Sequence, residues 1–416
     1  MKVILLLVIF FQFAFSYDAT IEVVKKVETL PSIAVEDASV SYDDSFKLKF
    51  FKSIVADLNV ISAFNVDRHH RITYFNDTNV LVLNKDMNYV LRYKMQEGDD
   101  ESLNIDIKLL RDNEEVLTKK YKTKKSSTYM FVAHAIAYDI NEFMGNKSVE
   151  WMKRKVIFSR IVSSKKSEIV IADYTLAYQH IIVKGGFNIF PKWADREQSG
   201  FYYTSLDSHK PILKYINIRS AKVKTLISSD GMLICSDVSS DGSKLLLTMA
   251  PDGQPDLYIY NIKTKNYKKI TSYSGIDVNG QFMNDNEIVF ISNRLGYPNV
   301  FSKKLDTNEI EQMVYYGKSN SSCSANGEYI VYKARETSNA FSKNTFNLHL
   351  ISTKTDFIRR LTATGVNEFP RFSKDGDAIL FIKNYKSQSA IGIIRLNQNK
   401  NYLFPLKYGR VQAMDW

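Results

Sequence analysis

The sequence predicts a small α/β N-terminal domain followed by an all-β six-bladed propeller that is closed by the C-terminal strand. A polar turn recurs along the last two-thirds of the chain, the first repeat lacks one strand, and a helical apolar pattern precedes the repeats. The turns are Glu197-Gln198-Ser199-Gly200, Ser240-Asp241-Gly242, Asn284-Asp285-Asn286, Ala325-Asn326-Gly327 and Lys374-Asp375-Gly376. Their last residues are 42, 44, 41 and 49 positions apart, a period typical of propeller blades.

Each repeat contains four strand-like runs. In the clearest repeat, Cys235–Ser239 is followed by the hairpin signal Asp241-Gly242, and Asp-Gly favours the positive φ angles of a tight turn. The runs Leu245–Thr248, Leu257–Ile262 and Lys268–Thr271 follow, and the first two are rich in residues that favour strands. Four strands joined by three turns make one propeller blade.

The first repeat is incomplete, and the end of the chain supplies what it lacks. Strands are expected at Val156–Phe158, Ile169–Ile171 and His180–Val183, but no inner strand precedes them. Val411–Trp416 resembles an inner strand without a blade of its own. We therefore expect these six residues to complete the first blade, which would remove free sheet edges. An open β-sandwich is the alternative architecture.

The first thirty residues carry targeting signals and an extended segment. Met1-Lys2 and an apolar run to Phe15, with small residues before a cleavage point, predict a secretory signal peptide over residues 1–16. Residues 17–30 are β-prone without a nearby hairpin partner. They form either an edge strand or loose tail, or an arm that pairs with the sheet edge of a partner.

Residues 31–150 are expected to form the α/β domain, and residues 151–416 the propeller. The spacing of apolar residues predicts a helix over 45–60, with Ser45 as its N-cap, and a second helix over 126–144 that Gly145 ends. Strands are predicted at Pro31–Val35, Asn88–Tyr93 and Leu103–Leu109.

The net charge of +11 is divided unevenly. Residues 17–150 hold 18 Lys or Arg against 22 Asp or Glu, whereas residues 151–416 hold 37 against 23. In a secreted chain such a basic propeller indicates an acidic protein partner, an anionic envelope surface or simple solubility, rather than nucleic acid.

Residues for catalysis or metal binding are not found in a recognisable pattern. The sequence has no Gly-x-Ser-x-Gly motif, and its only histidine cluster is His69-His70, whose adjacent side chains point to opposite faces of a strand. Cys235 and Cys323 fall in blades that are not neighbours, so a disulfide is not expected. We expect no catalytic residues, no metal and no cofactor.

At this point the chain resembles the TolB family, the periplasmic components of the Tol–Pal system of Gram-negative bacteria. The domain order matches over the whole mature chain. Similar segments are Ile54–Leu58, Ala133–Ile140 and Met144–Lys147 in the first domain, and Asp237–Lys244 and Phe369–Gly376 in the propeller. The chain departs from the family pattern at Ala194–Glu197, at Met283–Asn286 and in its closing strand.

The resemblance implies a non-enzymatic, monomeric periplasmic adaptor that supports outer-membrane integrity and envelope constriction during cell division. In such proteins the propeller binds Pal, an outer-membrane lipoprotein that grips peptidoglycan, and the N-terminal arm binds TolA. Other outer-membrane or peptidoglycan-associated proteins are further expected partners. A periplasmic glycan-active or ligand-binding propeller is the alternative function.

Candidate binding residues follow from the geometry of a propeller. Loops that precede the inner strands emerge on one rim of the channel, and mixed polar and apolar side chains there suit a protein contact. The candidate Pal-binding residues are Asn188, Met232, Leu233, Asp277, Asn279, Asn320, Asn367, Glu368 and Arg410. The candidate TolA-binding residues of the arm are Tyr17, Asp18, Ile21, Val23, Val24 and Val27.

Overall fold

The structure, a computed structural model, describes residues 30–40, 42–99, 102–124, 126–336, 345–385 and 388–416. The predicted signal peptide and residues 17–29 of the predicted arm lie outside these ranges. Within them, no helix combines the length and the apolar character needed to cross a bilayer.

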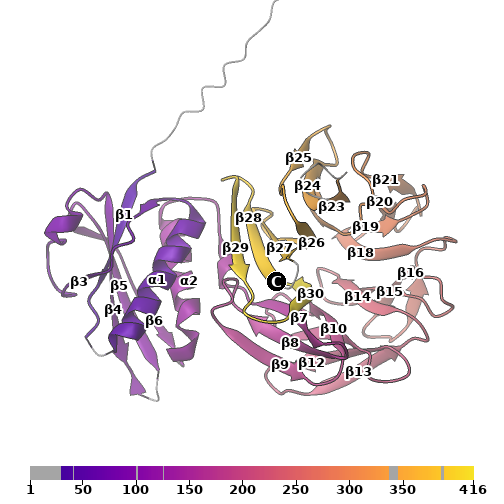
Figure 1. Cartoon of the computed structure of the whole chain (residues 1–416), viewed down its shortest axis with the longest axis horizontal. Coiled ribbons are helices and arrows are strands. Elements are labelled where there is room, and N and C mark those ends of the chain that lie inside the picture. Colours follow the sequence, from indigo (N-terminus) through magenta and orange to yellow (C-terminus); the bar gives the residue numbers. More distant parts are fainter. Residues whose placement is uncertain (1–29, 41, 100–101, 125, 337–344, 386–387) are drawn as a thin grey trace, which may run out of the picture. The chain divides into compact units, whose positions relative to one another are not determined.

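The N-terminal domain is a mixed sheet with two helices packed on one of its faces (Figure 1). Strand β1 pairs in parallel with β2, β3 and β4, and β4, β5 and β6 continue as an antiparallel meander. The elements are β1 Ser32–Asp37, α1 Asp44–Ile61, β2 Asn65–Val66, β3 Arg71–Ile72, η1 Val82–Asn84, β4 Tyr89–Glu97, β5 Leu103–Arg111, β6 Glu114–Thr123, η3 Ser126–Thr128 and α2 Tyr129–Phe143.

Helix α1 confirms the predicted helix and corrects its cap. Phe50, Ile54 and Leu58 recur at helical spacing and are fully buried in the core. The cap is Asp43, whose carboxylate accepts the backbone N–H of Phe46 at 2.9 Å, and not Ser45, which lies inside the helix. Aspartate and serine are both good caps, so composition alone did not separate the two positions.

Two other parts of this domain differ from the prediction. The predicted second helix starts as the 3₁₀ turn η3, and α2 itself begins at Tyr129, although Gly145 does follow its end with a positive φ of 68°. Strand β6 was not predicted from the sequence. It is an edge strand with mostly exposed residues and several lysines, so it lacks the apolar alternation that reveals a half-buried strand.

The remaining strands form six four-stranded units around a channel, and a short 3₁₀ helix, η4 Glu150–Lys153, leads into them. Blades 5 and 6 are joined by one parallel pair, Phe346 with Val366. From blade 1 to blade 6 the strands are: β30 Arg410–Asp415, β7 Val156–Ser163, β8 Lys166–Ala172, β9 Gln179–Lys184; β10 Asn188–Trp193, β11 Gly200–Ser205, β12 Ile212–Asn217, β13 Val223–Ser228; β14 Leu233–Val238, β15 Lys244–Met249, β16 Asp256–Asn261, β17 Tyr267–Lys269; β18 Asp277–Asn284, β19 Glu287–Ser292, β20 Asn299–Lys304, β21 Ile310–Gln312; β22 Cys323–Asn326, β23 Tyr329–Arg335, β24 Phe346–Ser352, β25 Ile358–Arg360; β26 Val366–Phe372, β27 Ala378–Asn384, β28 Ser389–Arg395, β29 Lys400–Pro405.

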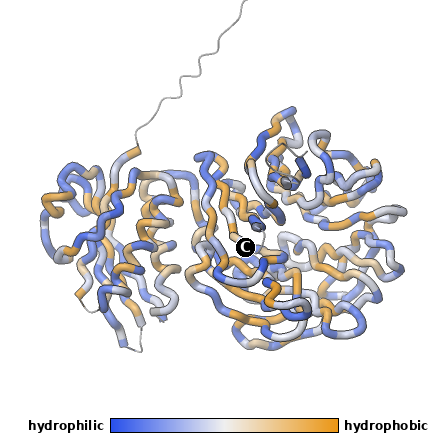
Figure 2. Tube along the Cα trace, viewed as in Figure 1, coloured by the Kyte–Doolittle hydropathy of each residue, from blue (hydrophilic) through white to orange (hydrophobic). Residues whose placement is uncertain are grey.

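The ring is closed by the strand that the sequence singled out. Strand β30 pairs antiparallel with β7, from Arg410 opposite Ile161 to Asp415 opposite Ile157. Figure 1 shows the chain end at the centre of the blades. Hydropathy supports the layered arrangement, because hydrophobic colour runs along the strands and the turns between them are mainly hydrophilic (Figure 2).

Five of the inner strands have a β-bulge or a similar irregularity partway along their pairing with the second strand of the blade. The register with the second strand shifts in β10, β14, β18, β26 and β30. In three of them a residue with positive φ stands at the shift: Phe190, Asn279 and Phe369. A bulge of this kind bends a strand and redirects the following side chains, here those at the end of each inner strand.

Helix α1 ends against blade 6 of the propeller. The guanidinium of Arg395 donates to the carbonyl oxygens of Val60 at 2.9 Å and Ile61 at 3.2 Å, in the last turn of the helix. The hydroxyl of Tyr402 donates to the carbonyl of Asn59 at 2.8 Å. A cation at a helix C-terminus also interacts favourably with the helix dipole, so blade 6 holds this helix end both sterically and electrostatically.

A second contact, to blade 1, is ionic and fully buried. His134 of α2 lies between the carboxylates of Asp57 in α1, at 2.8 Å, and Asp173 after β8, at 3.3 Å. The hydroxyl of Tyr174 also donates to Asp57. Burial alone would lower the pKa of His134, but the two carboxylates raise it to about 9, so the imidazole is charged at neutral pH.

Candidate functional site

The channel has two ends that differ in composition. The inner strands all begin at one end of the channel, which we call the upstream rim; it includes the loops before the inner strands and the turns between second and third strands. The inner strands all finish at the other end, which we call the downstream mouth. Seven of the nine candidate Pal-binding residues belong to the upstream rim, because they stand at, before or next to the start of an inner strand, whereas Asn279 and Glu368 stand at the central bulges of β18 and β26.

Five of these candidates are buried and hold the rim together. The amide nitrogens of Asn188, Asn320 and Asn367 donate to the loop carbonyls of Gly185, Tyr316 and Thr364. The Asp277 carboxylate accepts Arg294 at 3.0 Å, and Leu233 is part of the core. These side chains shape the rim loops and present almost no surface to a partner.

The other four candidates reach the surface to different degrees. Met232 and Arg410 are exposed. Glu368 is half-buried and already engaged, since it accepts Lys333 at 2.9 Å and Asn384 at 2.8 Å. Asn279 is also half-buried and donates to the carbonyl of Ser321 at 3.2 Å. Met232 and Arg410 are therefore the two candidates most available to a partner.

The rim also presents aromatic side chains that were not predicted from the sequence. Tyr315 is 81% exposed in the loop before β22, and Asn320 of that loop donates its backbone N–H to Pro298 in the neighbouring turn. The exposed large hydrophobic residues of the rim are Leu206, Met232, Leu295, Tyr297, Tyr315, Tyr316, Tyr385 and Tyr408. Tyrosines within polar loops were a readable signal, because such rings are frequent in protein interfaces.

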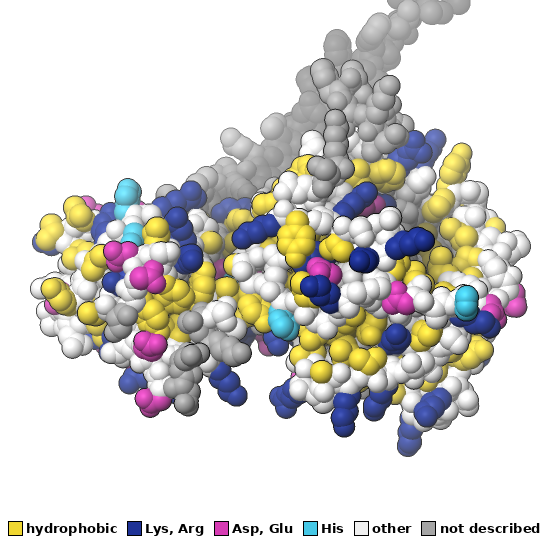
Figure 3. All heavy atoms as spheres, turned by 60° about the horizontal axis from the view of Figure 1, so that its bottom comes forward, with side chains coloured by type: hydrophobic (Ala, Val, Ile, Leu, Met, Phe, Trp, Pro, Cys, Tyr) yellow, Lys and Arg dark blue, Asp and Glu magenta, His cyan; other side chains and the backbone are white. Residues whose placement is uncertain are grey.

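The charged side chains on one face of the molecule do not form a single patch. Figure 3 shows Lys and Arg side chains spread over the face that it presents, with Asp and Glu between them. A positive excess spread in this way attracts acidic partners without fixing where on this face they dock.

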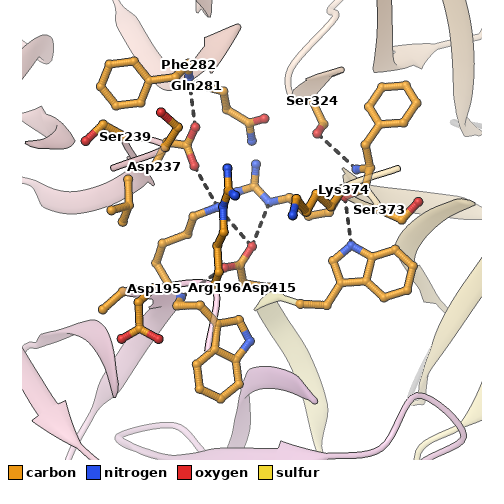
Figure 4. A pocket seen from close by; sticks show the side chains of 18 of the residues that line it. Asp195, Arg196, Asp237, Ser239, Gln281, Phe282, Ser324, Ser373, Lys374 and Asp415 are labelled. Atoms are coloured by element: carbon orange, nitrogen blue, oxygen red, sulfur yellow. Dashed lines mark hydrogen bonds and ion pairs between the residues drawn. The ribbon is translucent and has the colours of Figure 1, made fainter. Parts of the chain in front are cut away.

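The downstream mouth contains one polar residue from each blade at an equivalent position. Each of these residues pairs with the start of the second strand of its blade and borders a cavity of about 610 Å³ (Figure 4). In order from blade 1 to blade 6 they are Asp415, Lys192, Asp237, Gln281, Ser324 and Arg371, and we call them the mouth ring. Four of the six, Lys192, Gln281, Arg371 and Asp415, stand directly before an aromatic residue, which was a readable sequence signal; Asp237 and Ser324 do not.

Ion pairs join four members of the mouth ring. Lys192 contacts Asp237 at 2.9 Å and Asp415 at 3.0 Å, and Arg371 lies 4.0 Å from Asp415. Burial alone would lower the pKa of Lys192, but the two carboxylates outweigh it and raise the pKa. The lysine therefore stays charged and serves as an electrostatic tie between blades 1, 2 and 3, not as a base.

The histidines and cysteines of the described part of the chain do not form a metal site. No group of three or more His, Cys, Asp and Glu side chains there could hold a metal ion. Cys235 and Cys323 are free and buried, and burial raises the pKa of both thiols, that of Cys323 to about 12. His69 and His70 each contact a carboxylate, Asp67 and Asp37 respectively. The arm residues Tyr17, Asp18, Ile21, Val23, Val24 and Val27 lie outside the described residues.

Comparisons with known proteins give one consistent result. Residues 143–416 match the PD40 family model, described as the TolB beta propeller domain. The Tol-Pal system protein TolB of Wolinella succinogenes is 45% identical over 413 residues, covering 97% of each chain, and that of Campylobacter jejuni is 42% identical over 417 residues, covering 100% of each. A crystal structure of TolB from Acinetobacter baumannii superposes with a TM-score of 0.74 at 16% identity, covering 93% of this chain and 98% of that one, which shows a shared fold.

Proposed function

Because this chain belongs to the TolB family of Tol-Pal system proteins, we propose that it is a periplasmic adaptor that binds Pal and TolA. Pal docks on the upstream rim of the propeller, and TolA binds the N-terminal arm, residues 17–30. By linking the two, the protein supports outer-membrane integrity and envelope constriction during cell division.

The observation that carries the Pal assignment is the difference between the two channel ends. Exposed Tyr, Met and Arg side chains lie on the upstream rim; all three residue types are enriched in protein interfaces, and Tyr and Arg are frequent among the residues that dominate binding energy. The other exposed large hydrophobic residues of the propeller include Val223, Tyr267, Ile310, Ile358 and Leu403, each on the outermost strand of its blade. Tyr329 and Phe357 are also exposed and pack against each other on the downstream side of blade 5, so the upstream rim holds most, though not all, of the exposed aromatic side chains of the described propeller.

Substitutions on the rim are expected to weaken Pal binding without unfolding the propeller. Arg410→Glu and Tyr315→Ala should each lower the affinity for Pal at least about tenfold, because truncating an interface hot spot costs about 2 kcal/mol or more. Isothermal titration with purified Pal measures the effect. Glu368→Lys is a poorer test, because it would replace the ion pair between Glu368 and Lys333 by a contact between two lysines and could disturb the propeller itself.

Matched controls lie on the outermost strand of blade 3. Lys268→Glu and Tyr267→Ala make the same kinds of change on exposed residues of β17 and should leave Pal affinity unchanged. Wild-type affinity in both rim variants would show that Pal does not use this rim. Absence of Pal binding by the wild-type protein would contradict the proposed function itself.

Removal of the arm is expected to abolish binding of one partner and to leave binding of the other intact. A chain whose signal peptide is joined directly to Pro31 should lose TolA binding and keep Pal binding at least as strong as before. Co-purification with each tagged partner from periplasmic extract measures both. Loss of both partners, or of neither, would argue against a separate TolA-binding arm.

A further inference from the structure

The mouth ring alternates between hydrogen-bond acceptors and donors around the channel. Blades 1, 3 and 5 contribute side chains that accept, and blades 2, 4 and 6 contribute side chains rich in N–H donors. The acceptors are Asp415, Asp237 and Ser324, and the donors are Lys192, Gln281 and Arg371.

Each acceptor also takes a backbone N–H from the next blade, which shows that the three positions are equivalent. The carboxylate of Asp415 accepts the N–H of Trp193 at 3.0 Å, and the carboxylate of Asp237 accepts the N–H of Phe282 at 2.9 Å. In the same way, the hydroxyl of Ser324 accepts the N–H of Phe372 at 3.2 Å. The third acceptor position thus carries a neutral hydroxyl where the other two carry carboxylates.

This difference changes the surroundings of Arg371. Lys192 stands between two carboxylates at hydrogen-bond distance, whereas Arg371 has one carboxylate at 4.0 Å, and the acceptor position of its other neighbouring blade is the Ser324 hydroxyl. Its Nε is buried and has no hydrogen-bond partner among the described residues. The guanidinium, with five N–H donors and a side chain only 18% exposed, is therefore incompletely compensated inside a cavity.

We propose that the downstream mouth binds a carboxylate, held by Arg371 and Gln281 above Ser324. A guanidinium presents paired donors that match the two oxygens of a carboxylate. Figure 4 shows Gln281 and Ser324 at the wall of the same pocket, and the cavity of about 610 Å³ lies in the size range of small-ligand sites. The carboxylate belongs either to a small free acid or to an acidic side chain of a peptide.

Tryptophan fluorescence reports directly on this cavity. The three tryptophans of the chain, Trp151, Trp193 and Trp416, all line it. Titration of the full mature protein with glutarate, or with the peptide acetyl-Gly-Glu-Gly-amide, should change the emission saturably at constant ionic strength, and neutral glutaramide should not. Binding of glutarate assigns the site to free acids, and binding of the peptide alone assigns it to an acidic protein segment.

Replacing the third acceptor provides the decisive variant. Ser324→Asp places a carboxylate of the protein beside Arg371, so affinity for the carboxylate probe should fall at least about tenfold while the midpoint of thermal unfolding stays equal or rises. Ser324→Asn adds similar volume without charge and should not raise the midpoint. Arg371→Gln should also lose at least about tenfold in affinity, whereas Lys268→Gln, a loss of positive charge on exposed β17, should bind as wild type.

Two results would overturn the site. One is the absence of a saturable change with both carboxylate probes in the wild-type protein. The other is wild-type affinity in Arg371→Gln or in Ser324→Asp, each shown to be folded by circular dichroism. If Ser324→Asp does not fold, Arg371→Gln and Arg371→Lys decide the question, and equal affinity in all three proteins counts against the proposal.

Discussion

Removing residues 411–416 is expected to lower the free energy of unfolding of the propeller by at least about 5 kcal/mol. Val411 and Met414 are buried, and full burial of each such side chain contributes about 1.5–3 kcal/mol. The deletion also removes Asp415 from Lys192, which leaves a buried cation with one carboxylate fewer, and it exposes β7 as a free edge. Chemical denaturation of the full mature chain and of the truncated chain, followed by circular dichroism, measures the difference.

A synthetic peptide provides a control for this deletion. The peptide of residues 410–416, added in excess, should restore part of the lost stability by pairing with β7, and a scrambled peptide should not. Val411→Ala and Met414→Ala in the intact chain should give smaller, graded losses. Identical unfolding of the intact and truncated chains would mean that β30 does not close the ring.

Replacing His134 by Gln is expected to cost about 3–5 kcal/mol, because it leaves two carboxylates buried without their cation. Asp57 and Asp173 come from different parts of the fold, and the imidazole of His134 is the cation that lies between them. Burial, as the largest effect, already raises the pKa of Asp57, so the carboxyl would take up a proton once the cation is gone. Denaturant unfolding of the full chain measures the loss.

A second substitution separates charge from packing at this site. The double variant His134→Gln with Asp57→Asn removes one negative charge and should recover part of the stability lost in the single variant. Asp57→Asn alone leaves His134 paired with Asp173 and should cost less than His134→Gln. No recovery in the double variant would show that the imidazole acts through its volume and not through its charge.

The same cluster predicts a pH dependence. The pKa of His134 is about 9 in the folded protein against 6.5 for the free group, so its stabilising contribution is complete below about pH 6.5 and declines as pH rises through about 9. The groups that face the imidazole are Asp57 from α1 and Asp173 and Tyr174 from the loop after β8. His134→Gln should remove this part of the pH dependence between pH 6.5 and 9.

The closing strand β30 and the contacts of the N-terminal domain lie at the same part of the ring. The closing strand belongs to blade 1, and the N-terminal domain is held by Asp173 of blade 1 and by Arg395 of blade 6. The domain therefore contacts the first and last blades, between which the ring closes. Loss of the closing strand is expected to weaken domain contact as well, because both depend on the position of blade 1.

Local patterns predicted much of the fold. The turn period revealed the blades, and the missing inner strand of the first repeat revealed the closure, which the pairing of β30 with β7 confirms. Boundaries and polar elements were less predictable. The N-cap of α1 is Asp43 and not the predicted Ser45. Strand β6 was not predicted, because a lysine-rich edge strand has no buried face and therefore no alternation of apolar and polar residues.

Site residues were harder to predict, because function at a surface depends on exposure. Asn188, Asn320 and Asn367 had the polar character expected of a docking rim, yet their amides close the loops in which they stand. Tyr315 has no motif around it and becomes notable only once its exposure is known.

The sequence by itself determined the ring of blades, its closure by residues 411–416 and the absence of recognisable catalytic motifs, since each of these depends on order and spacing along the chain. Only the tertiary structure decided which side chains meet. The mouth ring draws one residue from each of six blades, and the cluster around His134 joins residues 57, 134 and 173. Such contacts depend on bulges, register and packing that bring distant residues to a common point, and no local pattern encodes them.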